Sequence, residues 1–335
     1  MLVGMLESYT AASIENKTIE QPMPIVEGLL PVGLAVLAGH PKLGKSFLSL
    51  LMCVCVSEGM PFLGRPTMEG ACLYIDLEGS KYRTQQRLNM IGLGFPEYLQ
   101  IVHDAPRLGE GLIESLEQWY CEVEPIPRLI VIDTITRARG NRHRNETAYD
   151  SDSKMFAPLQ RFALEKQVCI LLVTHLKKSN YHGESDDWLE RLNGSMGLSG
   201  ACDTVLGLFR KRGENTAILR TSCRDFDAGD AVLKFDDGLW TFVSDDVDDF
   251  KFRQNPLVKF IASIDYFSGT PSELCNMYVD FCEKEGIPHG LASTSQVASF
   301  GKKIGSLKKD MWRINHSLTS ERKKDGMHYC ISSYE

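Results

Sequence analysis

A glycine-rich segment, Gly39-His-Pro-Lys-Leu-Gly-Lys-Ser46, places the strongest constraint on the fold of this chain. It fits the pattern G-x-x-x-x-G-K-[ST] at every fixed position and lies between the apolar runs "LAVLAG" and "FLSLLMCVCV". A loop of this kind, between a buried strand and a helix, directs successive backbone N–H groups toward phosphate oxygens. The helix adds the positive end of its dipole. The segment therefore predicts an α/β domain that binds a nucleoside triphosphate.

The phosphate loop and the residue after it supply most of the expected contacts with ATP. We expect Lys45 to reach the β- and γ-phosphates and the hydroxyl of Ser46 to bind Mg²⁺. The expected nucleotide contacts from this segment are Gly39, His40, Pro41, Lys42, Leu43, Gly44, Lys45, Ser46 and Phe47.

Short apolar runs alternate with helical patterns from Leu34 to about Phe242. Runs without polar alternation, such as "ACLYIDLE", "RLIVIDT" and "CILLVTH", indicate strands that are buried on both faces. Three later runs, "DTVLGLFRK", "TAILRTSC" and "AVLKFDDGLWTFV", predict an antiparallel extension. The expected fold class is α/β, with a mainly parallel sheet covered by helices.

An acidic stretch from Ser244 to Phe250 marks the predicted boundary between two domains. The expected organisation is an N-terminal arm over 1–23, a nucleotide-binding domain over 24–245 and a small domain over 251–335. The last domain contains three helical patterns, beginning with "NPLVKFIASIDYF", and a hairpin around Glu321–Gly326. Three helices followed by a hairpin predict a winged-helix-like α+β domain.

The composition predicts the cellular compartment of the protein and shows that charge is distributed unevenly along the chain. The net charge is −7, but residues 251–335 carry 12 basic and 9 acidic side chains, so the rest of the chain sums to −10. The ten cysteines are scattered, several within apolar runs, and this pattern is typical of buried free thiols in a reducing cytoplasm. We see no signal peptide and no apolar run of about 18 residues, so we expect a cytoplasmic protein without membrane contact.

Three polar residues follow the predicted strands of the parallel sheet. Asp133 ends "LIVID", and its position suits an acid that orients Mg²⁺ through water. Glu78 ends "LYIDLE", where a carboxylate can activate the water that attacks the γ-phosphate. Asp76 is a competing candidate for this role, but Glu78 is nearer the carboxyl edge, where ligands bind in such sheets. His175 ends "ILLVTH" and is a candidate sensor of the γ-phosphate.

Together these residues resemble the RecA-like fold, in which the catalytic Glu follows the second strand. Within that fold, "VEGLLPVGLAVLAGHPKLGKSFLSL", "PFLGRPTMEGACLYIDLEGS", "LIVIDTITR" and "LLVTHLKKS" resemble the RepA-type hexameric replicative helicases of plasmids and phages, over residues 24–242. The resemblance implies a six-subunit ring with ATP between neighbours and single-stranded DNA through its centre. It implies Glu78 as catalytic base, Asp133 as magnesium-orienting acid and His175 as γ-phosphate sensor.

A ring ATPase also needs an arginine from the neighbouring subunit. The plasmid helicases have an Arg before a Gly-Ser pair, where this chain has Asn193, with Arg191 two residues away. Arg224, at the end of "TAILRTSC", resembles the basic residues that DnaB-like rings project into the adjacent site. We therefore assign the trans-acting role to Arg224.

Two basic segments after catalytic strands, and one in the small domain, are candidates for DNA contact. In RecA-like rings the segments after these strands bind the DNA backbone, and the attraction of cations to phosphates is independent of sequence. The small domain offers a basic helix and a basic hairpin tip, as winged helices that dock on DNA do. The candidates are Arg137, Arg139, Arg142, Arg144, Lys177, Lys178, Lys302, Lys303, Lys308 and Lys309.

These features predict an ATP-dependent DNA-replication motor, a hexameric helicase that binds single-stranded DNA. Its small domain is expected to bind origin DNA or another replication protein. Two alternatives remain open. One is a recombination or repair ATPase that forms filaments on DNA without unwinding it. The other is a nucleotide-switched regulator in which the small domain recognises a DNA site.

Overall fold

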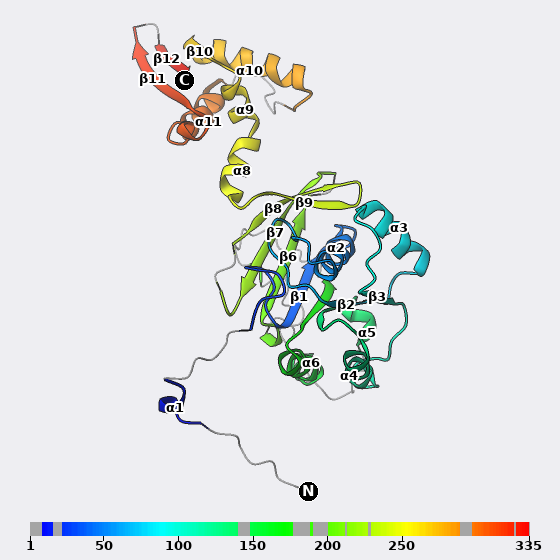
Figure 1. The fold of residues 1–335 in the computed structure, drawn as a ribbon. Helices are drawn as coiled ribbons and strands as arrows, with labels where there is room; N and C mark the ends of the chain where they lie inside the picture. The colour runs from blue at the N-terminus through cyan, green and yellow to red at the C-terminus, as the bar shows by residue number, and fades with distance from the viewer. Residues whose placement is uncertain are drawn as a thin grey trace. The chain divides into compact units, whose positions relative to one another are not determined.

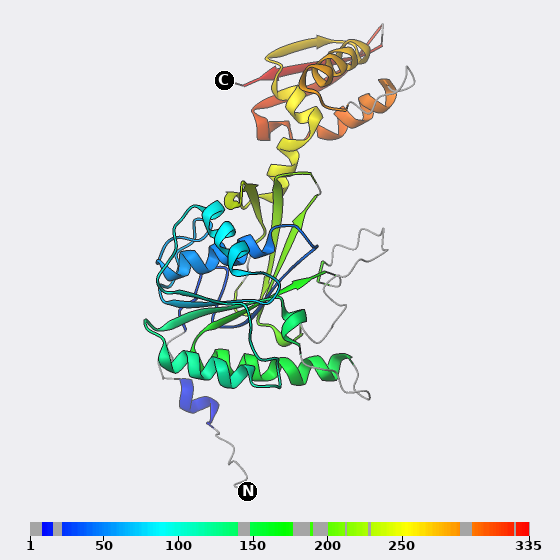
Figure 2. The same cartoon turned by 90° about the vertical axis from the view of Figure 1, so that its right-hand side faces the viewer.

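The computed structural model describes residues 9–15, 22–139, 148–176, 188–189, 200–211, 213–226, 229–288, 297–324 and 326–334 (Figures 1 and 2). The chain divides into two compact units, Met1–Asp245 and Asp246–Glu335. Each unit buries hydrophobic side chains of its own.

The first unit is built around a nine-stranded sheet with the strand order β3-β2-β4-β5-β1-β6-β7-β8-β9. The six strands from β3 to β6 pair in parallel, and β7, β8 and β9 continue the sheet antiparallel. The strands are β1 (Gly33–Gly39), β2 (Ala71–Asp76), β3 (Leu99–Val102), β4 (Pro127–Asp133), β5 (Cys169–His175), β6 (Thr204–Arg210), β7 (Thr216–Cys223), β8 (Ala231–Asp236) and β9 (Leu239–Ser244).

Helices cover both faces of this sheet, which explains the apolar runs in the sequence. Alternate residues of a strand point to opposite faces, so Leu37 packs with α2 and Val36 packs with α6. Figure 2 shows α2 on one side of the sheet and α6 on the other. The helices of this unit are α1 (Ala11–Glu15), α2 (Lys45–Ser57), α3 (Lys81–Ile91), α4 (Leu112–Glu122), α5 (Ile135–Ala138) and α6 (Ala148–Lys166).

The mainly parallel α/β architecture is confirmed, with two corrections in its later strands. The run expected to begin the antiparallel extension, β6, pairs parallel to β1 instead, and the antiparallel part begins at β7. The run "AVLKFDDGLWTFV" forms two strands, because Asp237 and Gly238 both have positive φ angles and reverse the chain. A tight turn of this kind, with Gly at its second position, joins antiparallel neighbours.

The second unit combines helices with a three-stranded antiparallel sheet in the order β10-β12-β11. One face of this sheet packs with α9, α10 and α11 around Phe260, Tyr278 and Ile331. The elements are α8 (Val247–Gln254), α9 (Pro256–Ala262), β10 (Tyr266–Gly269), α10 (Pro271–Glu285), α11 (Val297–Leu307), the 3₁₀ helix η3 (Met311–Ile314), β11 (His316–Lys323) and β12 (Gly326–Ser333).

One local prediction for this unit is wrong. The helix expected over "NPLVKFIASIDYF" ends at Ala262, and Tyr266–Gly269 forms β10 because it pairs with β12, a partner distant in sequence. Within the acidic stretch that marks the predicted boundary, the side chain of Asp246 accepts a hydrogen bond from the backbone N–H of Asp249 at the start of α8.

In the described ranges, none of the helices combines the length and apolar character that crossing a membrane requires.

Candidate active site

Four strands deliver polar residues to one edge of the large sheet. The strands β2, β4, β5 and β1 are consecutive neighbours and run in parallel, so their carboxyl ends meet at this edge. The register pairs Asp76 with Asp133, and Gly39 with His175. The structure thus brings together the phosphate loop, the two acids and the histidine that the sequence indicated.

The phosphate loop follows β1 and is braced by a residue that sequence analysis missed. Gly44 has a φ of 94°, and a Cβ there would approach the ring of Trp240 to 3.0 Å. The indole Nε1 of Trp240 donates to the carbonyl of Gly44 at 3.0 Å. Phe47, next to the loop, packs edge-on against Phe235. Trp240 comes from β9, and no local sequence signal links it to the loop.

Lys45 is buried and points back across the phosphate loop. Its Nζ donates to the carbonyls of Gly39 at 2.9 Å and His40 at 3.0 Å. Desolvation lowers the pKa of Lys45 to about 8, although the carboxylates of Asp133 and Glu78 act in the opposite direction. The ammonium therefore remains mostly charged at neutral pH, without an ion pair of its own in the described parts of the chain.

His175 lies directly against this ammonium. Its Nδ1 is 3.0 Å from Lys45 Nζ, and desolvation together with the Lys45 charge lowers the pKa of His175. A neutral imidazole with Nδ1 as acceptor is the form that fits this contact. The pair links the phosphate loop to the end of β5.

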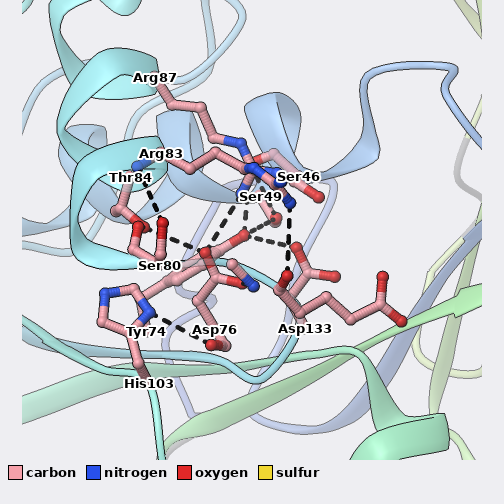
Figure 3. A network of polar contacts seen from close by, with 12 residues as sticks. Ser46, Ser49, Tyr74, Asp76, Ser80, Arg83, Thr84, Arg87, His103 and Asp133 are labelled. Atoms are coloured by element: carbon pink, nitrogen blue, oxygen red, sulfur yellow. Dashed lines mark hydrogen bonds and ion pairs between the residues drawn. The ribbon is translucent and has the colours of Figure 1, made fainter.

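Asp133 is held by a buried tyrosine. The hydroxyl of Tyr74 donates to Asp133 Oδ2 at 2.8 Å and lies 3.1 Å from Ser49 Oγ (Figure 3). Burial raises the pKa of Asp133, while the hydroxyls of Ser46 and Tyr74 lower it. Sequence analysis gave Tyr74 no role. The signal was present, because a tyrosine inside the apolar run "ACLYID" needs a buried partner for its hydroxyl.

The two acids at the carboxyl end of β2, Asp76 and Glu78, have different surroundings. Asp76 is 1% exposed and accepts hydrogen bonds from Gly79 N at 2.7 Å and Thr84 Oγ1 at 3.1 Å. Arg87 Nη1 lies 3.3 Å from the same carboxylate. A Cβ on Gly79 would overlap Asp76, so this close approach requires glycine. Asp76 is thus saturated with partners from the protein itself.

Glu78 is exposed at the edge of the site. Its Oε1 accepts a hydrogen bond at 2.8 Å from Oγ1 of Thr134, the residue that follows Asp133 in the chain. Within the described residues Oε2 has no hydrogen bond, so this carboxylate can accept a proton from a bound water molecule. The surroundings of the two acids favour Glu78 over Asp76 as a general base.

Arg224 lies away from these residues. It follows β7, whose last residue pairs with the first residue of β6, so it is at the opposite edge of the sheet from the phosphate loop. Its Nη2 donates to the carbonyl of Gly200 at 2.5 Å, and Nη1 is 3.5 Å from Asp203 Oδ1. Arg224 therefore takes no part in its own chain's site. The competing positions, Arg191 and Asn193, lie outside the described residues.

The predicted DNA contacts divide into several groups. Arg137 is exposed on α5, whereas the guanidinium of Arg139 lies over the ring of Phe156 at 5.4 Å. The cations at 302, 303, 308 and 309 are exposed on α11 and the turn after it. The other candidates, Arg142, Arg144, Lys177 and Lys178, lie outside the described residues.

Comparisons with known proteins bear on the first unit. A family profile described as AAA domain matches residues 4–181. No curated protein sequence matches the chain. One similar solved structure is described as an ATPase domain, and it has a TM-score of 0.53 and 15% identity, over 63% of this chain and 85% of that one.

A second solved structure, of a DnaB-like replicative helicase and its interactions with primase, has a TM-score of 0.54 and 15% identity. The similarity covers 63% of this chain and 59% of that one. At this level of identity the similarity defines a fold, and the fold is that of the RecA-like P-loop ATPases.

Proposed function

The chain belongs to the AAA domain family, and we propose that it is an ATP-driven DNA-replication motor, a hexameric helicase of the RepA type. One observation carries the proposal. The exposed Glu78 is held by Thr134 beside Asp133, at the sheet edge where Lys45 contacts His175. This arrangement supports a hydrolytic site, since a structural nucleotide site has no need of an available base.

The oxygen atoms at this edge suit ATP with Mg²⁺. In the proposal Ser46 holds the ion and Asp133, fixed by Tyr74, orients its water ligands. Mg²⁺ prefers oxygen ligands and keeps several waters, which matches one hydroxyl and one carboxylate. When bound, the ion neutralises phosphate charge. The backbone N–H groups of the phosphate loop contribute the remaining anion contacts.

In the proposed hydrolysis, Glu78, Lys45 and His175 each have a separate role. Glu78 takes the proton of a water that attacks the γ-phosphorus in line with the leaving ADP. Lys45 donates to the β- and γ-phosphate oxygens, where negative charge develops. His175 contacts Lys45, so loss of the γ-phosphate changes the charge beside the imidazole. In the proposal, His175 transmits this change to the segment after β5.

A ring assembly supplies the remaining parts of the motor. Arg224, exposed at the opposite sheet edge, is proposed to enter the neighbouring subunit's site. Single-stranded DNA is proposed to pass through the centre, against the basic segments after β4 and β5. The similarity of fold to DnaB-like ATPase domains supports this part of the proposal.

We propose that the second unit is a winged helix that binds origin DNA or another replication protein. From α9 onward, the α-helices and strands follow the order helix, strand, two helices and two strands, with β10 beside β12, and this order supports the assignment. Exposed lysines on α11 precede Trp312, whose side chain is 68% exposed. Basic and aromatic side chains on one segment suit contact with nucleic acid.

The test combines ATP hydrolysis, strand displacement and native mass measurement on the full chain. We expect a hexamer with an ATP analogue, hydrolysis stimulated by single-stranded DNA, and ATP-dependent displacement that Lys45→Ala abolishes. Cooperative DNA binding without displacement would favour a filament-forming ATPase. A footprint at one DNA site that survives Lys45→Ala would favour a regulator. A strictly monomeric protein under all these conditions would refute the ring.

A further inference from the structure

Helix α3 directs two arginines toward the proposed ATP site. Arg83 and Arg87 are four residues apart, so they lie on the same face of the helix. Figure 3 shows both side chains extending from α3 toward Ser46. The helix begins after the loop that carries Glu78, with the Ser80 side chain accepting a hydrogen bond from the backbone N–H of Arg83.

Arg87 has partners within the protein. Its guanidinium lies 3.3 Å from the carboxylate of Asp76 and 5.9 Å from the centre of the Phe47 ring. Its side chain is 17% exposed. Arg87 therefore connects α3 to the end of β2 and the start of α2, and its positive charge compensates a buried carboxylate.

Arg83 is placed differently. The side chain is exposed, and its Nη1 donates to the backbone carbonyl of Glu78 at 3.4 Å. A bond of that length to a neutral oxygen is weak. Over the ranges that the structure describes, Arg83 forms no ion pair. The guanidinium therefore lies next to the backbone of Glu78, and no carboxylate of the described residues pairs with it.

We propose that Arg83 is a catalytic residue that binds the γ-phosphate of ATP from within the same subunit. This inference rests on the proposed ATPase function. The attacking water forms a bond to the γ-phosphorus, the bond to the bridging oxygen breaks, and the water proton passes to Glu78. Charge spreads over the equatorial phosphate oxygens in this step, and a planar guanidinium donates to two of them at once. Arg83 transfers no proton.

A cation supplied in cis has a consequence for the assembly. Hydrolysis that depends only on a neighbour's arginine vanishes when the subunits separate on dilution. With Arg83 in the site, a basal rate per subunit persists on dilution, and Arg224 adds to that rate in the ring. Basal hydrolysis and ring-coupled hydrolysis thus depend on different arginines.

The experiment compares Arg83→Ala with Lys81→Ala in the full chain. Lys81 is an exposed cation in the same helical turn, so its loss matches the change in charge without removing the guanidinium. We expect Arg83→Ala to lower basal kcat by about 10²- to 10³-fold, as loss of a transition-state donor does. The dissociation constant of an ATP analogue changes much less, and Lys81→Ala behaves as the wild type. Millimolar guanidinium ion restores part of the rate to Arg83→Ala, an effect that a structural role does not predict.

The outcomes separate the inference from the function on which it rests. If the wild type neither binds nor hydrolyses ATP, the proposed function fails. If it hydrolyses ATP and Arg83→Ala retains its basal rate, only the role of Arg83 fails. Circular dichroism checks that the variant is folded, and Arg83→Lys is the alternative if alanine disrupts α3. A folded variant that is slow but insensitive to guanidinium also overturns the inference.

Discussion

The hydroxyl of Tyr74 offers the most direct test of how the site is built. Tyr74→Phe removes one oxygen that donates to Asp133 at 2.8 Å and contacts Ser49 at 3.1 Å. Tyr74 is fully buried and Asp133 is 3% exposed, so water cannot easily replace the lost donor. The ring itself keeps its packing in the core beside α2.

The magnitude follows from the charge and burial of the acceptor. A hydrogen bond to a charged group contributes about 1.5–3 kcal/mol, and a buried acceptor that loses its donor keeps the cost of desolvation. We expect the free energy of unfolding of the first unit to fall by about 2 kcal/mol. For a unit of this size, that corresponds to a decrease in Tm of about 4–8 °C. Asp133 also loses its orientation, so half-maximal ATP hydrolysis requires more Mg²⁺.

The assay is thermal unfolding followed by circular dichroism, together with ATPase titrations against Mg²⁺. Tyr120→Phe is the matched control, because the Tyr120 hydroxyl donates to the neutral carbonyl of Lys166 at 3.2 Å, outside the site. The control should lose about 1 kcal/mol and retain the wild-type response to Mg²⁺. If Tyr74→Phe unfolds like the wild type and needs no additional Mg²⁺, the hydroxyl does not position Asp133.

Three further predictions concern the base, the phosphate lysine and the second unit. Glu78→Gln keeps an acceptor for Thr134 but not the base, so kcat should fall by about 10²- to 10⁴-fold with unchanged binding of an ATP analogue. The pKa of Lys45 is lowered to about 8, so its amine is charged below that pH and neutral above it. We therefore expect kcat/KM for ATP to decline as pH rises through about 8. A flat profile of kcat/KM against pH would contradict the lowered pKa. In the second unit, replacing both Lys308 and Lys309 with Ala should weaken DNA binding across sequences and reduce the slope of log affinity against log salt by about 2. An unchanged slope in filter binding would place the DNA contact elsewhere.

Local patterns predicted the parallel part of the sheet and the residues expected at its carboxyl edge. The phosphate loop depends on a short run of neighbouring residues, and burial of a parallel strand on both faces leaves an apolar run that is visible without the fold. Parallel neighbours also end at one sheet edge, so Asp133 and His175 could be expected near the loop before any strand order was known.

The tertiary structure decided what depends on partners distant in the chain. Tyr266–Gly269 forms a strand because it pairs with β12, and β6 runs parallel to β1 because it pairs with that strand. Both partners are distant in the chain, so the local sequence does not reveal these pairings. Contacts with Gly79, Thr84 and Arg87 distinguish Asp76 from Glu78, although both lie at the carboxyl end of the same strand. These contacts depend on the folded structure, and no periodic pattern in the sequence indicates which residues they join. The sequence by itself determined which polar groups lie at the sheet edge. The fold decided which of their carboxylates are already hydrogen-bonded within the protein and which can still accept a proton from water.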